Sequence, residues 1–139
     1  MHKLKENLKP SYGAFSLQLG GESGDILATA VYVDMSKYNN VVAYAQAYDV
    51  ASDAVLTLVL WEATSAAGAG SATTSKTTTA TSTHATHKIV MQAEISAAEL
   101  TTGYKYVGAK LKTSDTGGTE DVSILLLQAN PRYGQATLP

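Results

Sequence analysis

The chain has 139 residues, of which 45% are hydrophobic and only 16% are charged, and its formal net charge at pH 7 is −2. This length is typical of one domain with its own core, and the slightly negative charge argues against the basic surface that nucleic-acid binding requires. The absence of cysteine excludes disulfides and thiolate metal sites.

The first ten residues, MHKLKENLKP, contain three lysines and end at a proline. No apolar stretch in the chain is long enough for a signal peptide or a membrane span, so we expect a soluble, unprocessed chain without a membrane segment. Because proline ends any helical turn begun here, we expect residues 1–10 to form an N-terminal arm. That arm is either frayed in solvent or ordered against a neighbouring subunit.

Two short strands are expected after the arm. Residues 12–19 alternate apolar and polar side chains before the turn sequence GGESGD. Residues 26–33, ILATAVYV, are rich in β-branched side chains. Asp34 follows, and its carboxylate is expected to cap a short turn by accepting hydrogen bonds from downstream N–H groups.

The stretch from Asn40 to Ala63 organises the rest of the chain. It contains two long strands, VVAYAQAY and AVLTLVLWEA, on either side of a polar break. In the first strand large side chains alternate with Ala43, Ala45 and Ala47, which is the period of a pleated strand. The second strand is apolar on both faces, as is typical of a strand inside a sandwich or at an oligomer contact.

The composition changes sharply after this pair. From Thr64 to Thr86 every residue except Lys76 and His84 is Ser, Thr, Ala or Gly, a bias that is common in linkers. Threonine is dense over residues 73–81, however, and β-branched side chains suit a pleated surface. We therefore expect an ordered edge strand or hairpin there rather than a tether.

A strand and a turn are expected next. Residues 88–93, KIVMQA, form the strand. Ser96 precedes Glu99 by three residues, the spacing of a capping box, and this predicts one helical turn over Ser96–Leu100.

The last expected elements form a hairpin and a tail. Residues 104–111 alternate as a half-buried strand, and SDTGGTED predicts a tight turn into the final strand, VSILLLQA. Pro131 then ends the sheet, and residues 131–139 form a C-terminal tail.

Seven or eight short strands without a long helical period predict an all-β protein. We expect an antiparallel β-sandwich or jelly-roll-like barrel with one helical turn and extended terminal arms. Residues 11–130 would form the single sandwich domain.

No catalytic or metal site is indicated. His84 and His87 are three apart and would point to opposite faces of a strand. There is no Gly-x-Ser-x-Gly elbow, and SDTGGTED lacks the ligand spacing of a calcium loop. We expect no enzyme activity, no metal and no cofactor. The eight tyrosines either fill strand positions, form an interface or provide a carbohydrate platform.

Four runs carry a resemblance to a known family. They are VDMSKYNNVVAYAQA (33–47), LWEATSAAGAGSAT (60–73), ELTTGYKYVGAKLKT (99–113) and ILLLQANPRYGQA (124–136). In order and spacing they resemble a family of small tailed-phage and prophage virion proteins encoded near the major capsid gene. The chain departs from that pattern at Ser65, where aspartate is common, and in its long threonine tract.

The resemblance implies a capsid decoration or cement protein on the outer surface of the virion. Such a protein would bind the major capsid protein as a homo-oligomer, with a trimer favoured, and would contact neither nucleic acid nor membrane. Because termini that order on assembly can wrap a partner, we expect the contacts to come from Lys3, Leu4, Lys5, Leu8, Lys9, Arg132, Tyr133 and Leu138. The alternatives are a head–tail connector or tail component, and a receptor- or carbohydrate-binding module.

Overall fold

The structure is a computed structural model, and it describes residues 8–16, 26–28, 32–68, 73–81, 87–114 and 121–132. All regular secondary structure in this part of the chain is β-strand. The nine strands are β1 (Leu8–Ser16), β2 (Ile26–Ala28), β3 (Val33–Asp34), β4 (Tyr38–Val50), β5 (Val55–Ala63), β6 (Thr73–Thr81), β7 (His87–Ser96), β8 (Tyr106–Thr113) and β9 (Asp121–Pro131).

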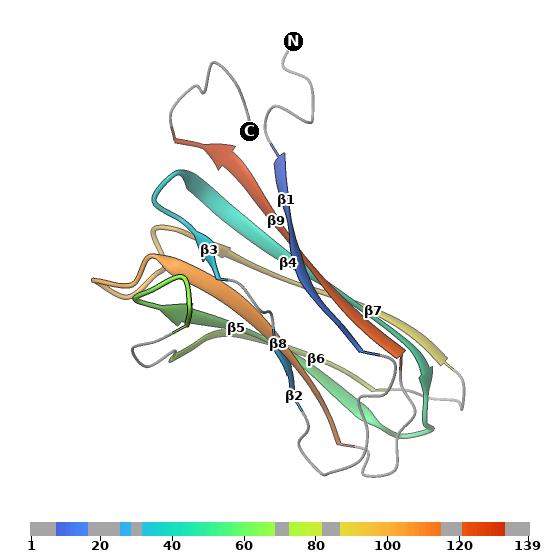
Figure 1. The fold of residues 1–139 in the computed structure, drawn as a ribbon. Coiled ribbons are helices and arrows are strands. Elements are labelled where there is room, and N and C mark those ends of the chain that lie inside the picture. Colours follow the sequence, from blue (N-terminus) through green and yellow to red (C-terminus); the bar gives the residue numbers. More distant parts are fainter. Residues whose placement is uncertain are drawn as a thin grey trace.

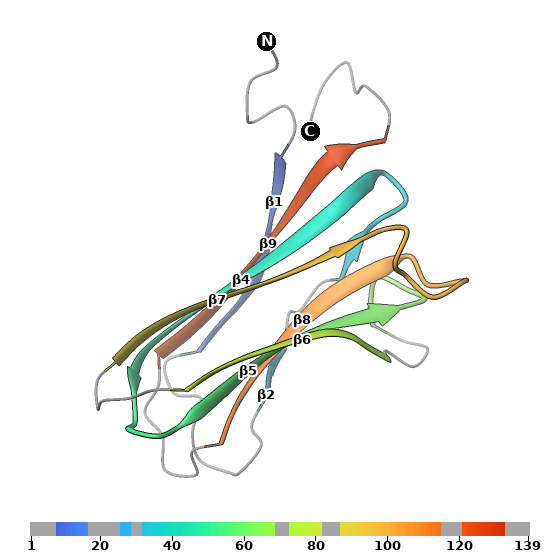
Figure 2. The ribbon, with the colours of Figure 1, turned by 180° about the vertical axis from the view of Figure 1, so that it is seen from behind.

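Two antiparallel sheets are stacked face to face (Figure 1). Sheet A has the strand order β1-β9-β4-β7 and sheet B the order β2-β8-β5-β6. β2 pairs with residues 110–112 of β8 and β3 with residues 106–107, so the two short strands share one edge of β8. Seen from behind, the edge strands β6 and β7 lie on the same side of the sandwich (Figure 2).

The strand partners are nested along the chain. β1 pairs with β9, β2 and β3 with β8, β4 with β7, and β5 with β6. A ribbon of nested antiparallel pairs wrapped into two sheets is the jelly roll. The prediction of an all-β antiparallel sandwich with jelly-roll character is therefore confirmed.

The predicted hairpin between the last two strands is wrong. β8 belongs to sheet B and β9 to sheet A, so the two strands are not paired with each other. β4 and β5 likewise lie in different sheets rather than side by side. Turn residues such as Gly and Asp mark where a strand ends, but they do not determine which strand becomes its partner. Of the consecutive strands that the structure describes, only β5 and β6 pair with each other.

The first strands also differ from the prediction. β1 starts at Leu8, so residues 8–10 belong to sheet A and not to an arm. The strand expected over residues 26–33 is replaced by β2 and β3. The threonine-rich strand is confirmed: β6 covers residues 73–81 at the edge of sheet B.

The helical turn predicted after β7 is a turn and not a helix. The capping contact on which it was based is present, because a Glu99 carboxylate oxygen accepts a hydrogen bond from the Ser96 N–H at 2.8 Å. The chain does not continue into a helix but turns again at Gly103, whose φ of +92° lies in the left-handed region that favours glycine. The turn predicted at Asp34 is confirmed, because its Oδ1 accepts from the Ser36 N–H at 2.8 Å.

The core lies between the sheets and is made by the inward side chains of both. β5 contributes a fully buried row of leucines, whereas the inward row of β4 is one valine, Val41, followed by three alanines. Burial of each large apolar side chain contributes about 1.5–3 kcal/mol. One buried polar group joins the sheets: the Gln128 amide of β9 donates to the Asp34 carbonyl oxygen of β3 at 2.8 Å.

Candidate functional site

The side chains that point outwards from β4, β7 and β9 form one broad surface, which we call the outer A face. Its centre is apolar because the alanines of β4 point inwards and leave Val42 and Tyr44 outside, and Tyr48 continues the same row at the end of the strand. On β9 the outward positions include Leu125, which is 41% exposed, and the half-buried Leu127.

The register sorts this face into rows. Val42 lies between Leu127 and Glu94 of the neighbouring strands, and Tyr44 lies between Leu125 and Gln92. The central strands of these rows therefore carry no charge, and the ionisable Glu94 lies on the edge strand. An apolar centre with a polar rim is the usual anatomy of a protein interface.

Amide side chains order one end of this rim. The Asn40 Nδ2 donates to the Glu94 carboxylate at 3.0 Å, and the Asn130 Nδ2 donates to the Asn40 Oδ1 at 3.2 Å. Three strands are joined by these bonds, because the residues come from β4, β7 and β9.

The outward surface of sheet B has a different chemistry. The Lys110 Nζ lies 3.3 Å from the centroid of the Trp61 ring, so an ammonium group covers the largest aromatic side chain there. Lys112 is exposed on the same strand, opposite the half-buried Thr57. On the described strands β5 and β8 this face therefore carries two lysines, one of which covers the Trp61 ring.

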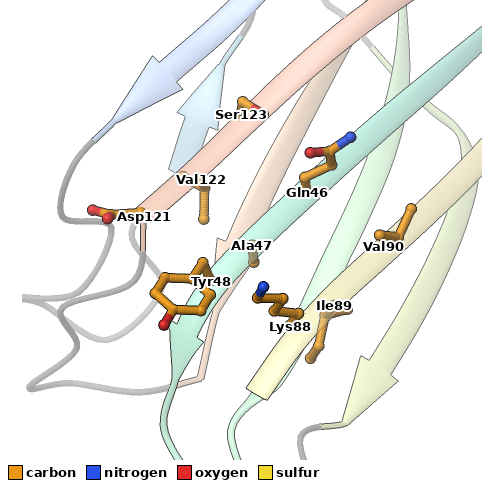
Figure 3. Close-up of a pocket in the computed structure, with 9 residues that line it drawn as sticks. All are labelled: Gln46, Ala47, Tyr48, Lys88, Ile89, Val90, Asp121, Val122 and Ser123. Atoms are coloured by element: carbon orange, nitrogen blue, oxygen red, sulfur yellow. The ribbon is translucent and has the colours of Figure 1, made fainter. Parts of the chain in front are cut away.

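A hollow of about 490 Å³ lies at the far end of the outer A face (Figure 3). Three residues from each of three neighbouring strands line it: 46–48 of β4, 88–90 of β7 and 121–123 of β9. The Tyr48 side chain is 48% exposed, and the Lys88 Nζ lies 5.3 Å from its ring centroid. We call this hollow the Tyr48 hollow.

An irregularity in β4 accompanies the hollow. The register between β4 and β7 shifts between Ala47 and Val50, and Asp49 has a φ of 59°. A bulge of this kind changes the direction of a side chain at the end of a strand, and bulges are frequent next to functional sites.

The three predicted capsid contacts that the structure describes fall at the opposite end of sheet A. Leu8 and Lys9 lie in β1, where they pair with Ala129 and Gln128 of β9. Arg132 is exposed, and its N–H donates to the Lys37 carbonyl oxygen at 2.9 Å. The other five contacts lie outside the described residues: Lys3, Leu4, Lys5, Tyr133 and Leu138.

Glu62 is the buried carboxylate of the described chain, and it has a structural role. Only 4% of it is exposed, and its two oxygens accept from the N–H and the hydroxyl of Thr101 at 2.6 and 3.1 Å. These bonds tie the turn after β7 to the end of β5. The described residues contain no group of three His, Cys, Asp or Glu side chains able to hold a metal ion.

No helix long and apolar enough to cross a bilayer occurs in the part of the chain that the structure describes.

The sequence did not identify the Tyr48 hollow. Its residues are far apart in the chain, and their meeting depends on the pairing of β4 with both β7 and β9. The sequence offered one indication, the alternation of large side chains with alanines along β4. Only the buried alanines of the fold show that the large side chains point outwards.

No protein-family model matches the chain, and no curated protein matches its sequence. Solved structures match most of its length at low identity. The VP2 subviral particle of infectious bursal disease virus is 14% identical with a TM-score of 0.56, over 89% of this chain and 32% of that one. The PBSX exported protein XepA is 10% identical with a TM-score of 0.56, over 94% of this chain and 40% of that one.

The PRD1 vertex protein P5 is 8% identical with a TM-score of 0.52, and the match covers 90% of this chain and 97% of that one. The chain thus spans less than half the length of the first two proteins and nearly all of the third. At these identities the likeness concerns the fold: the chain is a jelly-roll-like β-sandwich similar to those found in viral structural proteins.

Proposed function

We propose that this chain is a virion structural protein, specifically a capsid decoration or cement protein that binds the outer surface of the shell. It acts as a homo-oligomer, with a trimer favoured, and its partner is the major capsid protein. Its work is done by buried surface rather than by a chemical reaction.

The outer A face is the observation that carries this proposal. A protein that met only water would place polar side chains outside a sheet whose other side forms the core. Here Tyr44 and Leu125 lie side by side at the centre of the face, and Val42 and Leu127 form the next row. Burying such a patch against a partner removes apolar area from water at about 25 cal/mol per Å².

The nested strand order supports the same function. It places the start of β1 beside the end of β9, since Leu8 pairs with Ala129. The beginning of the first strand and the end of the last strand therefore lie side by side, where both can contact the same neighbouring protein. Many copies with modest contacts each give a stable coat, because multivalent attachment raises the overall avidity.

Occupancy on particles tests the proposal. Purified heads stripped of this chain are resupplied with the wild-type protein or with the double variant Tyr44→Lys, Leu125→Lys, and the bound copies are quantified. We expect the double variant to lose at least about tenfold in occupancy, whereas Lys112→Glu on the outward surface of sheet B leaves occupancy unchanged. Circular dichroism of each variant verifies that it is folded.

Imaging of the intact particle tests the role itself. A decoration protein is present in hundreds of copies distributed over the shell. A single ring at one vertex would instead identify a connector or tail component, and full occupancy by the double variant would remove the outer A face from the mechanism.

A further inference from the structure

The Tyr48 hollow has the composition of a ligand site. Its volume of about 490 Å³ lies in the range of 300–1,000 Å³ that is usual for small-molecule pockets. It combines an exposed aromatic ring, the apolar Val90 and four side chains able to form hydrogen bonds. In Figure 3 the ring of Tyr48 lies between Asp121 and Lys88, with Gln46 and Ser123 further along the same face.

The row through Tyr48 fixes the ring. Tyr48 pairs with Asp121 of β9, and the Lys88 ammonium group approaches its ring from β7. A cation at this distance from an aromatic centroid is attracted to the ring. The Lys88 contact restricts the ring on the side of β7, and nearly half of the Tyr48 side chain is exposed to a ligand, so that binding costs less side-chain entropy than it would for an unrestrained ring.

The next row supplies neutral hydrogen-bonding groups. Gln46 of β4 lies between Ser123 of β9 and Val90 of β7, and Val90 is 70% exposed. An amide offers two donors and an acceptor, and a hydroxyl offers one donor and two lone pairs. Together with Val90 they present polar and apolar groups on one short strip of surface.

The charges select the class of ligand. Lys88 and Asp121 contribute one charge of each sign, so the hollow favours neither an anion nor a cation. A hexose matches the remaining features, because it has an apolar C–H face for the aromatic ring and hydroxyl groups that both donate and accept hydrogen bonds. We propose that the Tyr48 hollow binds an uncharged hexose unit of a glycan, with its apolar face on Tyr48 and its hydroxyls on Gln46, Ser123 and Asp121.

This site is open and has a single aromatic side chain, so the dissociation constant of one hexose is expected to be roughly millimolar. An array of copies on one particle would raise the avidity for a glycan-coated surface. The inference does not depend on the proposed function, since that function rests on the rows of Val42 and Tyr44, whereas the hollow lies beyond these rows at the end of β4 and is tested by different variants.

Amide NMR of the full chain tests the site directly. The protein is titrated with the methyl glycosides of glucose, galactose, mannose and N-acetylglucosamine. We expect at least one of them to shift the amides of residues 46–48, 88–90 and 121–123 in a saturable way. Tyr48→Ala should weaken this binding by about tenfold or more, and Tyr48→Phe should retain it because the ring remains.

Tyr44→Ala is the matched control, because Tyr44 is on the same face of the same strand but outside the hollow. It should bind the sugar as the wild type does. The proposal is overturned if no glycoside shifts these amides, or if Tyr48→Ala, shown by its spectrum to be folded, binds as tightly as the wild type. A variant that loses shell occupancy but still binds the sugar would bear on the proposed function and not on the hollow. A variant that loses sugar binding but keeps full shell occupancy would bear on the hollow and not on the proposed function.

Discussion

β4 and β5 occupy equivalent central positions in the two sheets, yet they fill the core in opposite ways. The inward row of β4 is Val41 followed by three alanines at positions 43, 45 and 47, and Tyr44 and Tyr48 face outwards. The inward row of β5 consists of leucines at positions 56, 58 and 60, each of them fully buried. Both strands alternate with the same period, so the period alone does not tell which set of side chains is inside.

This difference separates stability from interaction. On β5 the inward leucines stabilise the fold, whereas on β4 the valine and tyrosines outside the sheet are only partly needed for it. Large apolar side chains on an outward face are informative because water gives no reason to place them there. The comparison predicts where substitutions unfold the protein and where they only change its surface.

The largest effect is expected in the leucine row. Leu58→Ala should lower the free energy of unfolding by about 3 kcal/mol, since it removes the Cγ and both Cδ atoms with their contacts and leaves a cavity. Denaturant unfolding measures this difference. Leu125→Ala on the outer A face, where the side chain is 41% exposed, serves as the control and should cost less than about 1 kcal/mol. Equal costs at the two positions would contradict the assignment of inward and outward faces.

The alanine row should respond to enlargement instead. Ala45 is 1% exposed, and Ala45→Leu should destabilise the protein by about 1–3 kcal/mol because a close-packed core cannot accept the added volume without strain. Gln46→Leu, one residue further and exposed, should remain within about 0.5 kcal/mol of the wild type. The idea of a filled core beside β4 fails if Ala45→Leu is as stable as the wild type.

The inward row of β5 ends in Glu62, and its removal should have an intermediate effect. Glu62→Ala deletes both acceptors for Thr101 and should cost about 1–3 kcal/mol. Thr101→Ser retains the N–H and the hydroxyl and should be nearly neutral. Thermal unfolding compares the stability of the variants with that of the wild type. A Glu62→Ala variant as stable as the wild type would show that this carboxylate does not hold the turn after β7.

The smallest effect is expected for Tyr32, which packs against the loop that follows β5. Tyr32 donates its N–H to the Ala66 carbonyl oxygen at 3.2 Å, and a Cβ added at Gly68 would lie 2.6 Å from the Tyr32 ring. Burial raises the pKa of Tyr32 above its ordinary value of 10.0. The neutral phenol is thus favoured in the folded state, and the stability that it contributes is full below pH 10 and lost as the pH rises through the folded pKa.

Tyr32→Phe should therefore unfold less readily relative to the wild type as the pH is raised above 10. Unfolding free energies of both proteins between pH 8 and about pH 11 measure this difference. A difference that does not change with pH would show that the Tyr32 phenol is equally solvated in the folded and unfolded states.

Local features of the fold were predictable because they depend on neighbouring residues. Strands followed from alternation, the edge position of β6 from dense threonine, and the turn at Asp34 from the reach of its side chain. The Ser96–Glu99 contact also followed from spacing, but the helix did not, because one capping contact is too weak to nucleate helical turns against the adjoining strand.

Pairing between distant strands was not predictable from the residues. The separation of β8 from β9 depends on which sheet each strand joins, and no local pattern encodes that choice. The Tyr48 hollow was missed for the same reason, since Tyr48, Lys88 and Asp121 meet only after two long-range pairings.

The nested order of the pairs also has a consequence for how the chain folds. β5 and β6 are the local pair, whereas β9, the last of the described strands in chain order, lies between β1 and β4 in sheet A. A ribosome-bound chain therefore holds β1 without its partner until β9 has been synthesised, and closure of that sheet must await a contact between distant parts of the chain. We expect slow maturation, and a nascent form whose exposed strand edges are liable to aggregate.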